Sequence, residues 1–175
     1  VGHINIGAGR IVVQDYTKIT NAIKDGSFYK NKVFLNAFDN VIKKNSNLHL
    51  MGCLSDGGVH SHIDHLKSLI KMAAKYGLKN FYIHAFLDGR DVFPMSAKKY
   101  VSEIIELLKE LKVGELASLN GRYYSLDRDN KWDRTKKVFD LLVKRNCEYF
   151  KDPISAIEAG YEKGLSDEFI EPCCI

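Results

Sequence analysis

Apolar residues follow two different periodicities between residues 47 and 145. Three short segments are apolar on both faces, as in strands buried inside a sheet, and they are residues 47–54, 80–87 and 116–119. Three longer segments repeat apolar residues every three or four positions, as in helices with one buried face, and they are residues 63–76, 96–111 and 131–145. The pattern therefore predicts the element order β-α-β-α-β-α.

Strands that alternate with helices in this way pair in parallel, and the helices cover both faces of the sheet. Two further helices are predicted ahead of this unit, at 15–25 and 31–44, and another begins after Asp152 and reaches Glu162. Residues 164–175 show no strong pattern. We therefore predict an α/β fold, a three-layer α/β/α domain with a mainly parallel central sheet.

Polar residues and glycines predict where several of these helices begin and end. Ser61 is placed to cap the helix that follows it, with Asp64 three residues later as in a capping box. Asp152 is placed as another N-cap, with Pro153 as the first helical residue. Gly114 is predicted to end the helix before it.

The composition is that of one globular domain, with 175 residues, 45% hydrophobic and 27% charged. No apolar run reaches the roughly 18 residues of a membrane span, and a net charge of +4 is too small to indicate a nucleic-acid partner. The four cysteines have no CxxC spacing, so we expect a reducing, cytoplasmic location without a zinc site or disulfide framework. The chain opens on Val1 without a methionine, which suggests that it was cut from a longer protein.

Each of the three predicted strands runs into a segment that combines glycine, a carboxylate and either histidine or arginine. These segments are SDGGVHSHIDH (55–65), DGRD (88–91) and NGRYYSLDRD (120–129). Ligands bind at the carboxyl ends of such strands. Glycine there lets backbone N–H groups approach a ligand, and arginine binds carboxylate or phosphate oxygens. We therefore predict an anion pocket formed by His60, Arg90, Arg122 and Arg128.

Two other functions stay open for the same residues. His60, His62 and His65 could form a metal cluster, which would make the protein a metal-dependent hydrolase, although a helix starting among them would turn them in different directions. The anion pocket could also serve a stand-alone module that binds a phosphate-bearing ligand without catalysis. His49 and His84 lie within predicted strands and are interpreted as interior histidines with satisfied hydrogen bonds.

Two of the arginines also have a purely structural interpretation. Arg122 precedes a pair of tyrosines on which it could stack. Arg128 lies between Asp127 and Asp129, with which it could form local ion pairs. Their position at equivalent strand ends favours a binding site over both.

Four motifs in order resemble those of the cofactor-independent (2,3-bisphosphoglycerate-independent) phosphoglycerate mutases. They are VGHINIGAGR, LSDGGVHSHIDHL, HAFLDGRD and GRYYSLDRDNKWDR, and the resemblance extends from Val1 to about Ile175. It implies an isomerase that interconverts 3-phosphoglycerate and 2-phosphoglycerate in glycolysis and gluconeogenesis through a phosphoserine intermediate. Enzymes of this family have an alkaline phosphatase-like domain with two Mn²⁺ or Mg²⁺ ions and a nucleophilic serine, and a phosphotransferase domain inserted into it.

The resemblance assigns residues 1–175 to the inserted phosphotransferase domain, with residues 1–30 as a candidate part of the hinge. It implies that the phosphatase-like domain is its partner within a monomeric, cytoplasmic enzyme that involves neither nucleic acid nor a membrane. The serine and the metal ions would belong to the part outside this chain. We therefore expect no metal or other cofactor here, weak binding of phosphoglycerate, and no mutase activity of this chain alone.

Five residues match substrate-contacting positions of the family, namely His60, Arg90, Asp91, Arg122 and Arg128. The resemblance implies that the arginines hold the carboxylate and the phosphate of the ligand, and that His60 holds phosphate or a hydroxyl. Asp91 would contact the glycerate hydroxyls. It is the candidate catalytic residue, as proton acceptor for the hydroxyl that attacks the phosphoserine.

Overall fold

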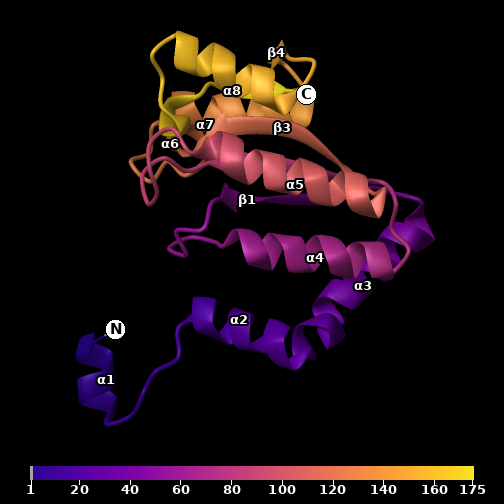
Figure 1. Ribbon diagram of the computed structural model, residues 1–175, viewed down its shortest axis with the longest axis vertical. Coiled ribbons are helices and arrows are strands. Elements are labelled where there is room, and N and C mark those ends of the chain that lie inside the picture. The colour runs from indigo at the N-terminus through magenta and orange to yellow at the C-terminus, as the bar shows by residue number, and fades with distance from the viewer. Residues whose placement is uncertain (1) are drawn as a thin grey trace.

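The three predicted strands form the parallel half of a five-stranded sheet in the computed structural model, which describes residues 2–175 (Figure 1). The strands are β1 (Leu48–Leu54), β2 (Phe81–Leu87), β3 (Glu115–Gly121), β4 (Glu148–Tyr149) and β5 (Cys173–Cys174), in the spatial order β1-β2-β3-β5-β4. The pairs β1–β2 and β2–β3 are parallel, as predicted, whereas β5 is antiparallel to β3. The sheet is therefore mixed and mainly parallel.

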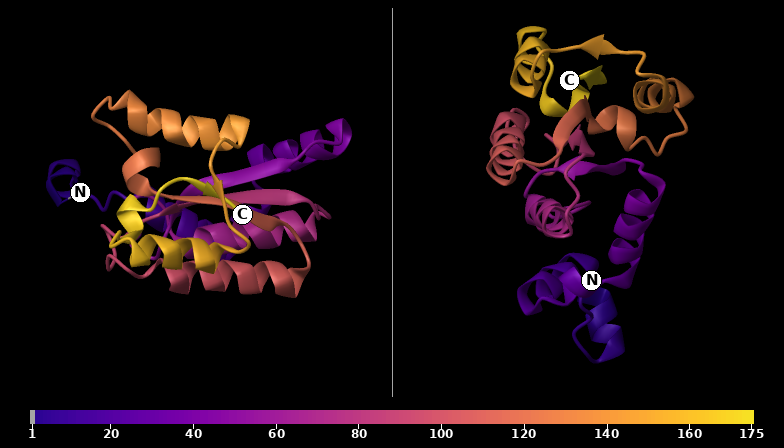
Figure 2. Two further views of the ribbon diagram at one scale, coloured as in Figure 1. Left: turned by 90° about the horizontal axis from the view of Figure 1, so that it is seen from above. Right: turned by 90° about the vertical axis from the view of Figure 1, so that its right-hand side faces the viewer.

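Helices cover both faces of the sheet, which confirms the three-layer α/β/α prediction (Figure 2). One layer consists of α4 (Ile63–Lys75), α5 (Ala97–Leu111) and α8 (Pro153–Glu162). On the opposite side lie α3 (Lys32–Lys44) and α7 (Trp132–Phe139). Because β1, β2 and β3 are parallel and each is followed by a helix, their carboxyl ends reach the same edge of the sheet.

The core lies between the sheet and the layer of α4 and α5. Phe81 and Ile83 of β2 belong to one buried cluster with Ile70 of α4 and Ile104 of α5, and these four side chains are fully buried or nearly so. The strand β2, which lies between β1 and β3, is buried on both faces, as its sequence indicates, whereas β1 is an edge strand on which Met51 remains exposed. Burial of this helical face supplies most of the stabilisation of an α/β domain.

The N-terminal helices lie beside the sheet and not in its core (Figure 1). Neither α1 (Gly2–Ala8) nor α2 (Asp15–Asp25) has a buried residue, and the first buried side chain is Phe28, in the short 3₁₀ helix η1 (Ser27–Lys30). Among residues 2–175, no helix is long and apolar enough to cross a membrane.

Two predicted helix ends differ from the structure, and one is confirmed. The cap of α4 is His62, whose Nδ1 accepts the Asp64 N–H at 3.2 Å, while the Ser61 hydroxyl donates to a strand carbonyl. The helix α5 ends at Leu111 with the left-handed Lys112 as its cap, whereas Gly114 lies two residues further on, where its own φ is also positive and a Cβ would lie 2.6 Å from the Phe81 ring. Asp152 caps α8 as predicted, with its carboxylate accepting two N–H groups of the first turn.

The last third of the chain holds elements that the periodicity does not predict. A single turn, α6 (Arg122–Ser125), follows β3 directly, and α7 continues as one π-helical turn, η2 (Asp140–Lys144). The tail, which has no strong sequence pattern, forms the 3₁₀ turn η3 (Asp167–Phe169) and then β5. The tail is therefore an integral part of the sheet, since β5 lies between β3 and β4.

Candidate functional site

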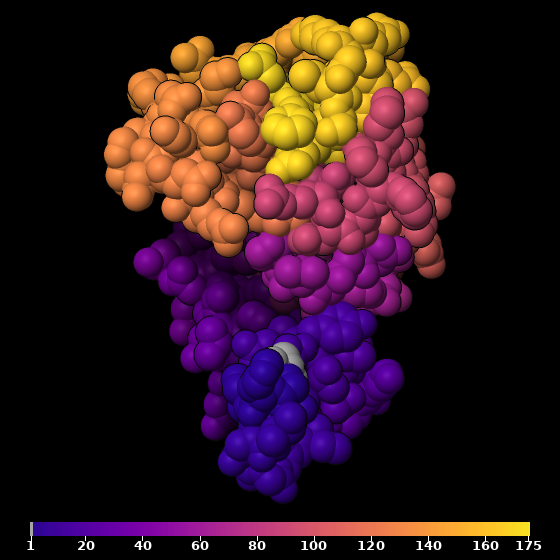
Figure 3. All heavy atoms as spheres, turned by 90° about the vertical axis from the view of Figure 1, so that its left-hand side faces the viewer, coloured from indigo at the N-terminus to yellow at the C-terminus, as the bar shows by residue number. Residues whose placement is uncertain are grey.

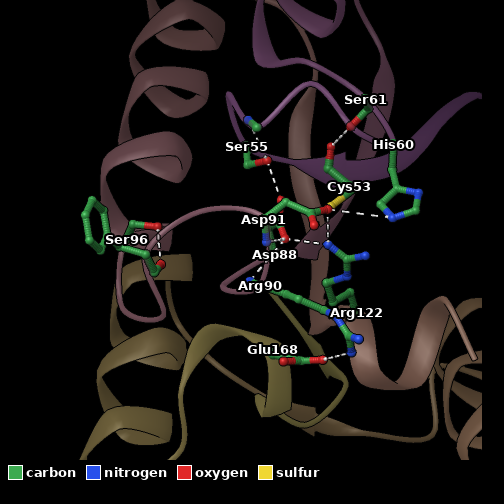
Figure 4. A network of polar contacts seen from close by, with 12 residues as sticks. Cys53, Ser55, His60, Ser61, Asp88, Arg90, Asp91, Ser96, Arg122 and Glu168 are labelled. Carbon is green, nitrogen blue, oxygen red and sulfur yellow. Dashed lines mark hydrogen bonds and ion pairs between the residues drawn. The ribbon is translucent and has the colours of Figure 1, made fainter. Parts of the chain in front are cut away.

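The segments that follow β1, β2 and β3 meet at one edge of the sheet, as predicted from their order. Figure 3 faces this edge and shows the magenta, pink, orange and yellow parts of the chain converging on it. Figure 4 shows the side chains there, with His60, Asp91 and Arg122 in one connected network. The structure thus brings together residues from all three strand ends.

Arg122 is the buried centre of this network. Its Nη1 donates to Asp88 Oδ1 and to Asp91 Oδ2, both at 2.6 Å, and only 8% of Arg122 is exposed. Burial by itself would lower the pKa of Arg122, but the carboxylates of Asp91 and Asp88 outweigh it and raise that pKa. Arg122 therefore stays charged in a fixed orientation, and it does not stack on the tyrosines that follow it.

Asp88 anchors this loop, although its role was not recognised from the sequence. Its carboxylate, 3% exposed, accepts the Ser55 hydroxyl at 2.5 Å, the Arg122 guanidinium, and the backbone N–H groups of Asp91 at 3.0 Å and Arg90 at 3.3 Å. Burial opposes ionisation of Asp88, but these hydrogen bonds together hold its pKa below the ordinary value. The sequence does mark Asp88, as the first aspartate of the DGRD motif.

Asp91 connects the buried ion pair to the open side of the site. Its Oδ2 faces both Arg122 and His60, whose Nε2 lies 3.7 Å away, and the His60 side chain is about half exposed at 47%. Its Oδ1 accepts no hydrogen bond from any residue within 2–175. Asp91 therefore presents one oriented carboxylate oxygen that remains available to a ligand.

Arg90 points along a different direction, toward the tail. Its Nη1 donates to Glu168 Oε1 at 3.2 Å, and its side chain is 62% exposed (Figure 4). Glu168 was not predicted as a site residue, because it lies in the tail segment without a sequence pattern. The pair brings a carboxylate from η3 into the group of strand-end residues.

Two glycines of these loops have a different role from the one expected. A Cβ on Gly121 would lie 2.1 Å from the Glu168 carbonyl oxygen, and one on Gly89, which has a positive φ of 63°, would lie 2.8 Å from Asp167 Cβ. The Gly121 N–H also donates to the Ile170 carbonyl at 2.7 Å. These glycines admit the tail, not a ligand, and so fix Glu168 at the site.

The structure does not bring Arg128 into contact with the other candidates. It lies exposed in the loop between α6 and α7 and forms no hydrogen bond or ion pair within the part of the chain that the structure describes. The predicted local pairing is also absent there, because Asp127 binds Arg134 at 3.1 Å and the Lys131 N–H at 2.8 Å. Arg128 is an exposed, unconstrained cation near the same edge.

The three closely spaced histidines separate into two places. His60 faces Asp91, whereas His62 and His65 pack against Tyr16 of α2 with ring centroids 5.4 and 5.5 Å away. Across residues 2–175, no three potential metal ligands of the His, Cys, Asp and Glu types gather in one place. The arrangement gives no support to a hydrolase that binds a metal through these histidines.

The two strand histidines also differ from each other. His84 is buried, as predicted, and contacts Ser118 Oγ through Nδ1 at 2.7 Å and His49 through Nε2 at 2.9 Å. His49 is exposed, contrary to the prediction, because β1 is the edge of the sheet. Burial, together with the neighbouring His49, lowers the pKa of His84 to about 4.

Comparisons with known proteins all match this chain to phosphoglycerate mutases. The family described as the BPG-independent PGAM N-terminus matches residues 19–175. Proteins named 2,3-bisphosphoglycerate-independent phosphoglycerate mutase are 49% identical in Clostridium perfringens and 51% identical in Clostridium tetani, each over 175 residues. Those matches cover all of this chain and 34% of each relative, so the chain spans about a third of their length.

A solved structure gives the same result for the fold. It is titled as crystal structures of Leishmania mexicana phosphoglycerate mutase at low cobalt concentration, and it matches with a TM-score of 0.89 and 30% sequence identity. The match covers 95% of this chain and 32% of that one.

Proposed function

This chain belongs to the family of 2,3-bisphosphoglycerate-independent phosphoglycerate mutases, and on that premise we propose that it forms the substrate-binding part of such an enzyme. The reaction would be the interconversion of 3-phosphoglycerate and 2-phosphoglycerate. In this proposal residues 1–175 are the phosphotransferase domain, and residues 1–30 contribute to the hinge toward a phosphatase-like domain in the same monomeric, cytoplasmic protein.

One observation carries the proposal: three strand ends converge on a fixed pair of charges, Arg122 and Asp91, with His60 beside them. A phosphoglycerate carries a carboxylate, a phosphate and a hydroxyl. Guanidinium groups bind the two anionic groups, and a carboxylate binds the hydroxyl. The site offers both kinds of partner within one network (Figure 4).

The three arginines would bind the ligand in different ways. Arg122 is held rigidly by two carboxylates and would set the position of one anionic group. Arg90, which is paired with Glu168, and Arg128 are both exposed and would move onto the ligand from the rim. His60, half exposed beside Asp91, would donate to a phosphate oxygen or a hydroxyl.

Asp91 would act as the catalytic proton acceptor. In the proposed cycle a serine outside this chain receives the phosphoryl group, and the bound glycerate turns so that its other hydroxyl attacks the phosphoserine. That hydroxyl loses its proton as it attacks, and the available Oδ1 of Asp91 accepts it, while Arg122 holds the carboxylate in place. Glycerate has to stay bound during this turn, because its escape would leave the phosphoserine to be hydrolysed and the enzyme would act as a phosphatase.

The metal ions of such an enzyme do not fit the residues of this chain. Within residues 2–175, no group of three His, Cys, Asp or Glu side chains converges. The proposal therefore assigns Mn²⁺ or Mg²⁺ binding to the phosphatase-like domain.

Titration of this chain with ligands, followed by NMR, tests the proposal. We expect weak, saturable shifts with 3-phosphoglycerate and 2-phosphoglycerate that exceed those with glycerate or inorganic phosphate, and no turnover in an enolase-coupled assay. Asp91→Asn should leave binding within about threefold, because the amide keeps an oxygen at the site. Equal affinity for phosphoglycerate and inorganic phosphate would contradict the proposal, and so would turnover by the chain alone.

A further inference from the structure

The paired groups of the candidate site carry no excess of positive charge before any ligand arrives. The two arginines that the structure brings to it face three carboxylates: Arg122 contacts Asp88 and Asp91, and Arg90 contacts Glu168. A ligand with one carboxylate and one phosphate carries about −2.5 to −3 charges. Such a ligand meets two positive and three negative groups here, so an internal carboxylate already competes with it for each guanidinium.

The ion pair between Arg90 and Glu168 is easier to break than the pairs of Arg122 with Asp88 and Asp91. Asp88 is 3% exposed and accepts four hydrogen bonds, so its pair with Arg122 is costly to break. Arg90 is bound to Glu168 by one contact of 3.2 Å and is 62% exposed, so its guanidinium can move at little cost.

Glu168 itself is held in place. Its carbonyl packs against Gly121, where a side chain would not fit. The neighbouring Asp167 is buried and accepts the N–H groups of Ser96 and Ala97 at 2.8 and 2.9 Å, which ties the tail to the start of α5. The Glu168 side chain is also only 16% exposed, against 62% for Arg90, so when the pair opens we expect the arginine to move and the glutamate to stay.

We propose that Glu168 is an internal counter-ion that holds Arg90 in the ligand-free chain and lowers the affinity of the site for anions. This inference rests on the proposed function, because it treats the strand ends as an anion site. Glu168 competes with the anionic ligand for Arg90, and its fixed negative charge stays beside the bound ligand. It thereby makes the site selective for a ligand whose anionic groups bind Arg90 more strongly than the Glu168 carboxylate does.

Glu168→Gln tests this inference, because glutamine keeps the shape and an oxygen acceptor but loses the charge. The unmodified chain and the variant are titrated by NMR with 3-phosphoglycerate and, separately, with inorganic phosphate at low ionic strength. We expect affinity for both anions to rise about fourfold, which one unit charge at roughly 5 Å gives in a water-like dielectric. The gain should shrink at high salt. An unchanged or weaker affinity for both anions would overturn the inference.

Two control variants separate this effect from a general change in charge. Glu171→Gln removes a negative charge from the same tail, where Glu171 pairs with Lys137 at 2.8 Å, and it should leave both affinities unchanged. In an Arg90→Gln background, Glu168→Gln should give a smaller gain, because only the direct repulsion of the ligand is relieved and no arginine is released. An equal gain from Glu171→Gln, or a full gain without Arg90, would overturn the role of Glu168. A gain for inorganic phosphate without any preference for phosphoglycerate would support Glu168 but contradict the proposed function.

Discussion

Replacing Asp88 by asparagine removes one negative charge from the buried network at the strand ends while preserving its shape. The carboxylate accepts three short hydrogen bonds, from Ser55 at 2.5 Å, Arg122 at 2.6 Å and the Asp91 N–H at 3.0 Å. A hydrogen bond to a charged group exceeds a neutral one by about 1 kcal/mol, so the variant should lose about 3 kcal/mol of unfolding free energy. For a domain of this size that corresponds to a melting temperature lower by about 6–12 °C.

Thermal and urea unfolding at pH 7, followed by circular dichroism, would measure this loss. The control is Asp56→Asn, because Asp56 accepts Tyr100 OH at the same edge but its side chain is 43% exposed, and it should cost less than about 1 kcal/mol. The pKa of Asp88 lies below its ordinary value of 3.8, so its ionised form stabilises the fold above that pH and the contribution is lost as pH falls further. A melting temperature of Asp88→Asn within about 2 °C of the unmodified chain would refute this reasoning.

Three further outcomes follow from the structure. The folded chain holds the pKa of His84 at about 4, below its ordinary 6.5, so between these pH values the unfolded chain binds a proton that the folded chain does not. The free energy of unfolding should therefore fall by up to about 3 kcal/mol as the pH is lowered from 6.5 to 4. In urea titrations, His84→Gln should reduce this loss of stability at acid pH. Gly121→Ala should lower the melting temperature strongly, since its Cβ would lie 2.1 Å from the Glu168 carbonyl, whereas Gly52→Ala, with open space around it, should not. Arg128→Ala should leave unfolding within about 0.5 kcal/mol but weaken phosphoglycerate binding in NMR titrations; unchanged binding would remove Arg128 from the site.

The repeated strand–helix pattern of residues 47–145 was enough to predict the parallel half of the sheet and the edge at which the candidate site lies. Apolar residues such as Ile83 and Ile104 fall at the spacing that their elements require, and both are fully buried or nearly so. Local periodicity carries this information because each β-α unit packs on the next one along the chain. The three strand ends then meet as a consequence of topology alone.

The contacts that connect distant segments could not be predicted in this way. The antiparallel strand β5 is two residues long and has no periodicity, and Glu168 reaches Arg90 from 78 residues away. The glycines of the loops suggested a ligand, yet Gly121 accommodates the tail. The Ser61 hydroxyl turns to the Cys53 carbonyl, and the Asp64 N–H donates to His62 instead. Spacing along the sequence does not decide which of two adjacent polar side chains caps the helix.

The late position of β5 also affects how the chain acquires its structure during synthesis. The strands β1, β2 and β3 leave the ribosome in the order in which they pair, but Leu119 of β3 finds its neighbour Cys173 only 54 residues later. Until then the nascent chain presents an unpaired sheet edge, the kind of surface that chaperones bind and that promotes aggregation. The same delay keeps Glu168 away from Arg90, so a polypeptide that stalls before the tail emerges holds its strand-end arginine without its counter-ion.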